Sequence, residues 1–352
     1  MAVRDEQPTL AIGPANYAGQ ATAWAHAVAE HLPATAWSFA EAPRPDSFQF
    51  PVDSPLPRWQ FRNPVARGMR SRWLFRQATH VAIDGFEPWF HLRRRGQLAG
   101  DLEWLRRNGL TTALIAHGTD VRDPRHHMEI NGRWSMFHAG TPEWREDLIR
   151  ATRVHRAIAE ESGLPVFCST PDLLLDLPFG TWLPVCLDVA AWHTEQPVLE
   201  RAVPRVLHVP SKRTPPIKGT QFVEPVLEKL ARVGRIEHVA PSGVTNAEMR
   251  DLVHSVDIVV DQILAGSYGV ASIESLAAGR VTFGRLSPET EALMPEAPPI
   301  FGTNPETLEE ELCKVLDDRD AARVKAAAGP GFTSRWHDGR ASAEVLRGYL
   351  GV

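Results

Sequence analysis

The stretch "DIVVDQILAGSYGVASIESLAAGRVTFG" (residues 257–284) decides the fold class, because it contains a complete strand–loop–helix–strand unit. The apolar, β-branched run 257–262 predicts a strand, and 270–279 predicts a helix that ends at a glycine. The run 280–284 predicts a second strand. Two strands joined through a helix favour a parallel sheet.

The same alternation of strand and helix runs through the chain on both sides of this stretch. Strands are expected at 9–14, 34–39, 79–85, 111–120, 164–170, 181–188, 204–211 and 235–240, and helices at 19–32, 62–77, 101–109, 141–162, 219–234, 245–256, 305–318 and 339–350. The alternation breaks once, near residues 188–204. We therefore expect an α/β protein with two Rossmann-like domains facing a cleft, covering residues 1–190 and 191–338.

Composition excludes several classes of protein. The 352 residues carry a net charge of -5, which argues against nucleic-acid binding by the molecule as a whole. No run of about 18 apolar residues predicts a membrane-spanning helix, and the N-terminus lacks a signal-peptide pattern. The three cysteines fit no disulfide or zinc spacing, which indicates a reducing cytoplasm.

Ligands of open α/β sheets bind beyond the carboxyl ends of the strands, so the loops that follow strands are the candidate sites. Loop 13–20, "GPANYAGQ", leads into a helix with small residues, and Asn16 and Gln20 add polar groups. It predicts an anion site at a helix N-terminus or, equally, an ordinary turn. No G-x-G-x-x-G motif occurs, which disfavours a nicotinamide oxidoreductase.

Two further loops carry charge or a histidine. His117 follows an apolar strand in "HGTDVR" (117–122), either as a cleft residue or as a packed core histidine. The loop "PSKRTPPIKGT" (210–220) holds Lys212, Arg213 and Lys218, and the chain has only five lysines in all. Lys218 precedes a helix start, where charge and helix dipole together favour phosphate; a solvated basic loop is the alternative.

Two acids lie in the opening stretch. Asp261 ends the predicted strand, and Glu274 lies inside the helix that follows. Carboxylates are seldom buried without a partner. Glu274 is therefore either a ligand-binding acid or a partly exposed, salt-bridged helix residue.

Taken together these loops resemble the GT-B glycosyltransferases, specifically the large retaining family 4 group (glycosyl transferases group 1). The segments that carry the resemblance are "TTALIAHGTDVR", "PVFCSTPDLLLDLPFGTWLPVCLD", "HVPSKRTPPIKGT" and the opening stretch. The resemblance implies a nucleotide-diphosphate sugar as donor, with UDP expected, and a small-molecule, glycan or lipid-linked acceptor. It also implies that the C-terminal helix, residues 339–352, packs back on the first domain.

The resemblance implies the following roles, residue by residue. Glu274 accepts hydrogen bonds from the ribose, and Arg213 and Lys218 neutralise the diphosphate. His117 contacts the donor sugar or its β-phosphate side. Asn16 and Gly19 belong to the loop that approaches phosphate and acceptor, and backbone groups of Tyr268, Gly269 and Val270 meet the phosphates. Family members transfer the sugar with retention, with the leaving phosphate helping to deprotonate the acceptor. No Asp-x-Asp motif stands at a strand end, so no metal is expected.

One position departs from the family pattern. Where the family often carries E-x(7)-E, Gly266 occupies the place of the first glutamate. Its role passes to Asp261, to Gln262 or to backbone, or is lost. An epimerase acting on the same donors, or a donor-binding protein without turnover, are the alternative functions.

The stretch 58–76, "RWQFRNPVARGMRSRWLFR", has six arginines and no acid, with aromatic residues between them. It predicts an amphipathic surface helix with a solvated basic face, or a contact with an anionic membrane or charged acceptor. The cysteines predict a cytoplasmic protein, and this stretch adds peripheral membrane contact as an alternative to a purely solvated surface.

Overall fold

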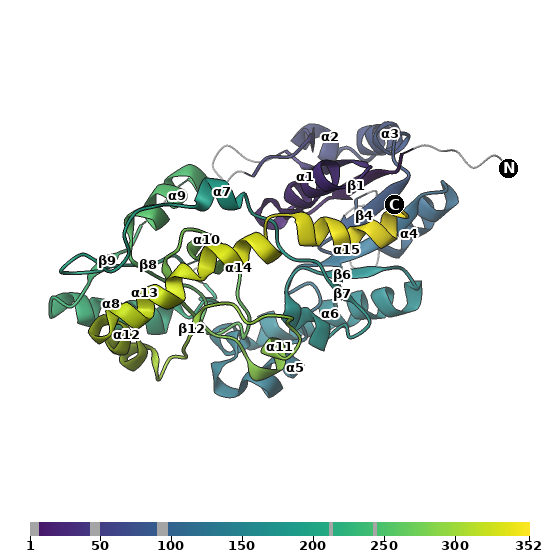
Figure 1. Ribbon diagram of the computed structural model, residues 1–352. Coiled ribbons are helices and arrows are strands. Elements are labelled where there is room, and N and C mark those ends of the chain that lie inside the picture. Colours follow the sequence, from purple (N-terminus) through teal and green to yellow (C-terminus); the bar gives the residue numbers. More distant parts are fainter. Residues whose placement is uncertain (1–6, 43–49, 90–97, 211–213, 242–244) are drawn as a thin grey trace. The chain divides into compact units, whose positions relative to one another are not determined.

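The computed structural model describes residues 7–42, 50–89, 98–210, 214–241 and 245–352 (Figure 1). The chain forms two compact units. Unit 1 comprises residues 1–122, 150–186 and 339–352, and unit 2 comprises residues 123–149 and 187–338. The expected fold class is confirmed, because each unit is built on a parallel sheet with helices packed against it.

The sheet of unit 1 has the strand order β3-β2-β1-β4-β5-β6-β7, and every neighbouring pair is parallel. Its strands are β1 (Thr9–Gly13), β2 (Thr35–Glu41), β3 (Ser54–Leu56), β4 (His80–Asp84), β5 (Thr111–Ala116), β6 (Val166–Cys168) and β7 (Thr181–Trp182). The order reverses between β1 and β4. Ligands of such sheets bind at this switch point.

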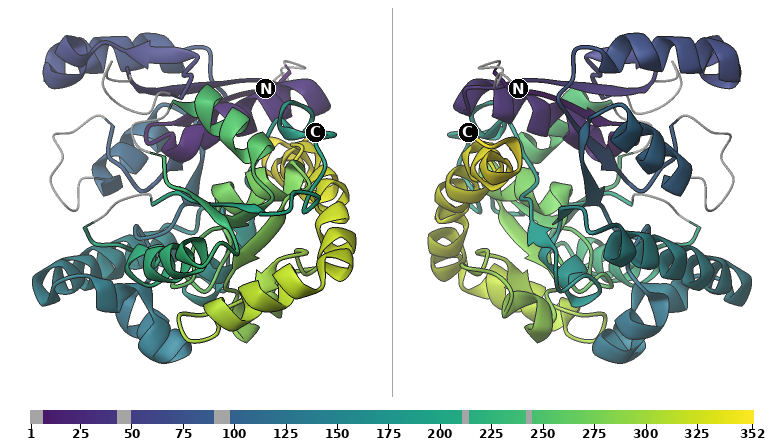
Figure 2. Two further views of the ribbon diagram at one scale, coloured as in Figure 1. Left: turned by 90° about the vertical axis from the view of Figure 1, so that its left-hand side faces the viewer. Right: turned by 90° about the vertical axis from the view of Figure 1, so that its right-hand side faces the viewer.

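Two helical layers cover the sheet of unit 1. Its helices are α1 (Gln20–His31), α2 (Arg58–Arg62), α3 (Pro64–Phe75), α4 (Leu98–Arg107), most of α6 (Pro142–Ser162) and α15 (Arg340–Leu350), with 3-10 turns at Tyr17–Gly19 and Pro171–Leu175. Leu10 and Ile12 of β1 pack with Trp24 of α1 and Leu346 of α15 on one side of the sheet. Ala11, which lies between them, belongs to a second hydrophobic cluster on the other side. The alternation follows from the two-residue period of a strand. Figure 2 shows α15, in yellow, beside the purple α1.

The sheet of unit 2 has the order β12-β11-β10-β8-β9 and is also parallel. Its strands are β8 (Arg205–His208), β9 (Glu237–Val239), β10 (Ile258–Val260), β11 (Val281–Gly284) and β12 (Phe301–Gly302). Its helices are α5 (Pro124–Asn131), α7 (Val189–Trp192), α8 (Thr220–Arg232), α9 (Asn246–Ser255), α10 (Val270–Ala277), α11 (Pro288–Glu291), α12 (Leu308–Asp317), α13 (Arg319–Ala327) and α14 (Gly329–Trp336), with 3-10 turns at Gly132–Trp134 and Met136–Ala139. The switch point lies between β8 and β10.

The compact units do not follow the order of the chain throughout. A single division near residue 190 was predicted, but the internal segment 123–149, which precedes that point, belongs to unit 2. Met136 and Phe137 are part of the unit 2 core, and the backbone N–H of Met136 donates to the carbonyl of Leu264 at 3.0 Å. This segment therefore lies beside the loop that follows β10.

The strands at the two edges of the unit 1 sheet differ from the sequence-based expectation. The strand expected over 181–188 has only two residues; the N–H of Leu183 still donates to the carbonyl of Cys168 at 2.8 Å, but Pro184 has no N–H with which to continue the pairing. The strand β3 at the other edge was not predicted, because it has only three residues and contains Pro55. No helix in the described part of the chain has both the length and the apolar character needed to span a membrane.

Candidate functional site

The switch point of unit 2 holds a buried ion pair. Asp261 directly follows β10 and is almost fully buried, and Lys218 Nζ lies 2.9 Å from its Oδ1. The other carboxylate oxygen accepts from the backbone N–H of Ser272 at 3.1 Å and from its hydroxyl at 2.6 Å. Burial alone would raise the pKa of the Asp261 carboxyl, but the Lys218 charge and these hydrogen bonds hold the pKa below its usual value. Asp261 therefore stays ionised and holds Lys218 in place.

His208, at the end of β8, ties the two strands of the switch point together. Its Nδ1 donates to the carbonyl of Val260 at 2.8 Å, which leaves Nε2 to accept from the hydroxyl of Thr220 at 2.9 Å. Burial lowers the pKa of His208 to about 4, and the charge of Lys218 acts in the same direction. The imidazole is therefore neutral and serves to position the start of α8 beside Lys218.

Glu274 lies on α10 beside this pair. Within the described residues no hydrogen bond or ion pair reaches its carboxyl, although part of the side chain still meets solvent. Burial raises the pKa of Glu274 to about 8, with Asp261 adding to the rise and Lys218 opposing it. An acid that is largely withdrawn from water without a protein partner is a candidate ligand-binding group.

The loop before α10 presents backbone rather than side chains. Gly269 is the N-cap of α10 and has no side chain to cap the helix, and Asp261 already accepts from the N–H of Ser272, so the N–H groups before Ser272 are the ones that can meet an anion. The side chain of Tyr268 is buried, and its hydroxyl lies 3.1 Å from His337 Nε2. Tyr268 thus anchors the loop to the segment after α14, and its side chain is not available to a ligand.

The position of Gly266 is filled by a side chain from another segment. Gly266 has φ +68, and a Cβ there would collide with the amide oxygen of Asn131. Asn131 is fixed in turn, because its Nδ2 donates to the carbonyl of His127 at 3.1 Å and its Oδ1 accepts from Arg285 Nη1. The space expected for a first glutamate therefore contains an amide paired with a guanidinium.

The two other candidates for that role are also engaged within the protein. Asp261 is paired with Lys218, and Gln262 Nε2 donates to the carbonyl of Ser267 at 2.6 Å. Gln262 thus braces the loop before α10. Asn131 and Arg285 are the polar groups that this structure places at the Gly266 position instead.

Substituting alanine for Gly266 tests this packing. We expect Gly266→Ala to lower the free energy of unfolding by about 2 kcal/mol or more, since a strained left-handed residue costs about 1 kcal/mol and the clash with Asn131 adds to it. Gly279→Ala is the matched control, because Gly279 has φ +66 but only Pro330 near its Cβ position, at 3.8 Å. Urea unfolding of both variants gives the comparison; equal losses would contradict the proposed clash.

In unit 1 a buried aspartate accepts hydrogen bonds from the loop that follows β1. Asp84, at the end of β4, accepts from the backbone N–H of Ala15 at 2.7 Å and of Asn16 at 2.8 Å, and lies 3.3 Å from His117 Nε2. The Asn16 side chain accepts from the N–H of Thr22 at 3.2 Å and donates to the carbonyl of residue 51 at 3.0 Å. Asn16 therefore holds the loop in shape.

Gly19 and His117 complete this cluster. Gly19 has φ +74, and a Cβ there would meet the ring of Phe50 at 2.8 Å, so the close approach requires glycine. The His117 ring packs against Trp24 at 5.4 Å and edge-on against Tyr17 at 5.2 Å, while Asp120 accepts from its backbone N–H at 2.9 Å. His117 is thus packed against aromatic rings and directed at a carboxylate.

The structure therefore groups the predicted residues into two clusters. Lys218, Glu274 and residues 268–270 lie at the switch point of unit 2, and Asn16, Gly19 and His117 lie around Asp84 in unit 1. Arg213 lies outside the described residues. Asp84 was missed, although it ends an apolar strand as Asp261 does; Arg285 has no sequence signal of its own.

Comparisons with known proteins bear on the fold. No protein-family model matches the sequence, and no curated protein matches it. Among solved structures, the sucrose-phosphate synthase of Thermosynechococcus elongatus is 13% identical over 97% of both chains, with a TM-score of 0.57. HepE of Anabaena, solved with UDP and glucose, is 11% identical over 98% of this chain and 100% of that one, with a TM-score of 0.60. A UDP-N-acetylglucosamine 2-epimerase is 11% identical over 98% and 96% of the two chains, with a TM-score of 0.56.

These likenesses confirm the expected GT-B fold, similar to that of the group 1 glycosyltransferases, over nearly the whole chain. At such low identity they establish the fold alone. The activity has to be argued from the two clusters of residues described above.

Proposed function

We propose that the chain transfers a sugar from a nucleoside-diphosphate sugar, with UDP as the nucleoside diphosphate, to an acceptor hydroxyl, with retention and without a metal. The observation that carries the proposal is Glu274, a largely buried carboxyl without a hydrogen-bond or ion-pair partner in the described chain, next to Lys218 at the switch point of unit 2. That end of a parallel sheet is where such folds bind nucleotides.

The donor fits this cluster group by group. The ribose diol donates two hydrogen bonds to the Glu274 carboxylate, and so supplies a partner that the described residues do not provide. Lys218 and the backbone at the start of α10, at Gly269 and Val270, take the diphosphate, and Arg213, which lies outside the described residues, is proposed to do the same. The positive groups also stabilise the diphosphate as it leaves, on the order of a few kcal/mol for each well-placed donor.

In the proposed reaction the bond between the sugar's anomeric carbon and the phosphate oxygen breaks, and a bond to the acceptor oxygen forms on the same face. The acceptor hydroxyl proton passes to the leaving phosphate. No carboxylate nucleophile takes part, so the carboxylate pair of retaining hydrolases is not required. The resemblance adds two further roles to this proposal: contact with the donor sugar or its β-phosphate side for His117, and approach to phosphate and acceptor for the loop of Asn16 and Gly19.

The raised pKa of Glu274 makes donor binding depend on pH. If the ribose binds the ionised carboxyl, affinity for UDP-glucose increases about tenfold per pH unit up to the pKa of about 8 and then levels off. UDP-glucose suits the measurement because its diphosphate has no proton to lose in this range. Calorimetry at pH 6, 7 and 8 gives the profile. If the affinity of the wild type did not change with pH, the proposed role of Glu274 would be wrong. Glu274→Gln is expected to bind UDP-glucose weakly, with an affinity that does not change with pH.

A scan of nucleotide sugars by mass spectrometry tests the function itself. Transfer to an added acceptor, or slow donor hydrolysis, supports the proposal. An epimerised donor would favour the epimerase reading, for which a fold match exists, and binding without any turnover would favour a donor-binding protein. Glu274→Ala and Lys218→Ala are both expected to lose donor affinity, whereas Glu228→Ala, an exposed acid on α8, is the control that keeps it. Retained affinity in the first two would remove the proposed site.

A further inference from the structure

The outward face of α3 carries a row of large apolar side chains. Val65, Met69 and Trp73 follow one another at four-residue spacing, and they are 71%, 69% and 52% exposed. Trp59 on α2 is 66% exposed. A surface helix usually directs its apolar residues inward, so this row reverses the normal pattern.

The same face is cationic. Arg72 and Arg76 share it at helical spacing and are exposed, and within the described residues neither guanidinium has an ion-pair partner. The Arg70 guanidinium lies over the Trp73 ring at 4.1 Å. No acid occurs anywhere in residues 58–76, so nothing on α2 or α3 offsets these charges.

The inward face shows that α3 is firmly packed rather than loosely attached. Leu74 and Phe75 are buried in the unit 1 core, and the Trp89 Nε1–H donates to the Ser71 hydroxyl at 2.6 Å. The apolar row on the opposite side is therefore a fixed surface of the folded protein.

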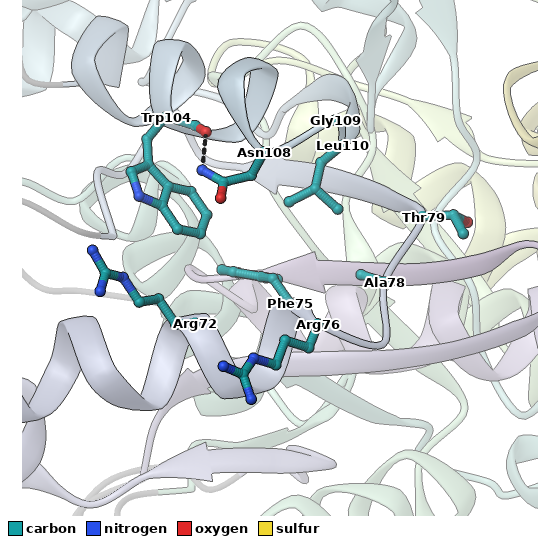
Figure 3. Close-up of a pocket in the computed structure, with 9 residues that line it drawn as sticks. All are labelled: Arg72, Phe75, Arg76, Ala78, Thr79, Trp104, Asn108, Gly109 and Leu110. Carbon is teal, nitrogen blue, oxygen red and sulfur yellow. Dashed lines mark hydrogen bonds between the residues drawn. The ribbon is translucent and has the colours of Figure 1, made fainter.

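A pocket of about 570 Å³ lies beside this face, where α3 and α4 end and β4 and β5 begin. Figure 3 shows Arg72 and Arg76 on the α3 side and Trp104 and Asn108 on the α4 side, with Phe75 between them. The amino ends of the strands meet here, so the pocket lies at the opposite end of the sheet from Asp84 and His117. It is thus separate from the loops proposed for the reaction.

We propose that the face formed by α2 and α3 docks on an anionic phospholipid surface and that the pocket between Arg72 and Trp104 takes a phosphate-bearing headgroup. Tryptophan, methionine and valine enter the headgroup boundary, while arginines beside them reach lipid phosphates. Nucleic acid would match the arginines but leave Val65 and Met69 exposed. Because the whole chain has a net charge of -5, attraction to anionic lipid requires a local basic surface such as this face.

Vesicle sedimentation with the full chain tests the proposal. The wild type is expected to sediment with vesicles of equal parts phosphatidylcholine and phosphatidylglycerol, but not with phosphatidylcholine alone, and salt should weaken the binding. Removing two surface charges in Arg72→Gln/Arg76→Gln should lower the partition coefficient about 30-fold. Met69→Ser/Trp73→Ser should lower it about tenfold or more.

Matched controls remove the same chemistry elsewhere. Arg153→Gln/Arg232→Gln removes two exposed arginines on α6 and α8, and Val233→Ser/Val324→Ser removes two exposed valines of unit 2; both should bind as the wild type does. Wild-type binding that ignores lipid charge, or that survives in both α3 variants, overturns the proposal. So does equally strong binding to soluble polyglutamate, which would indicate an acidic polypeptide as the partner.

Discussion

We expect the substitution Glu274→Gln to make the protein more stable at pH 8 and to lower its affinity for the donor. Glutamine has the same shape but never ionises, so it avoids the cost of a largely buried charge. The folded-state pKa of about 8 lies above the ordinary value of 4.5. Between these values the folded protein keeps a proton that the unfolded chain releases, so wild-type stability falls as pH rises from 4.5 to 8. At pH 7 the difference from the variant is on the order of 3 kcal/mol.

Urea unfolding at several pH values measures this effect. The advantage of Glu274→Gln should shrink toward zero as pH falls to about 4.5 and reach its full size at about 8. Glu228→Gln, on the exposed face of α8, should show no such trend. Identical pH slopes for wild type and Glu274→Gln would mean that the carboxyl is well solvated, and its proposed role would lose its physical basis.

The second large effect is expected from Lys218→Ala. The substitution leaves the buried Asp261 carboxylate without its cation, which should cost about 3 kcal/mol in the free energy of unfolding. Donor affinity should fall as well, since Lys218 is proposed to bind the diphosphate. Lys229→Ala is the control, because the Lys229–Glu309 pair at 2.6 Å is exposed and should contribute less than about 1 kcal/mol.

A double variant separates the two roles of Lys218. Lys218→Ala/Asp261→Asn removes the unpaired charge, and the asparagine can still accept from Ser272, so stability should largely return. Donor affinity should stay low. If donor affinity returned with stability, Lys218 would be only a partner for Asp261, and the diphosphate would have to bind elsewhere.

The features that could be predicted from the sequence are those that depend on residues close together in the chain. Alternating strand and helix patterns predicted both sheets, and residues just after strands pointed to Lys218, Asp261 and the loop of His117, because the carboxyl ends of parallel strands face one way. Glu274 was identifiable as an acid in an otherwise apolar and small-residue helix.

The features that could not be predicted depend on contacts between segments that are far apart in the sequence. Asn131 fills the space at Gly266, and nothing in either local sequence indicates that α5 belongs to unit 2. The buried side chain of Tyr268 is a similar case, since its partner His337 lies near the other end of the chain. The strand β3 escaped notice because it is short and lies among prolines, where local signals favour a loop.

The two contacts of Asp261 have a consequence for selectivity. One carboxylate oxygen holds the loop of Lys218 and the other holds Ser272, on the same helix as Glu274. The distance between Lys218 and Glu274 is therefore fixed by the fold before any ligand binds. We expect such a site to distinguish nucleotides by the length of their phosphate chain, binding a nucleoside diphosphate, whose ribose meets Glu274 while its phosphates meet Lys218, more tightly than the monophosphate.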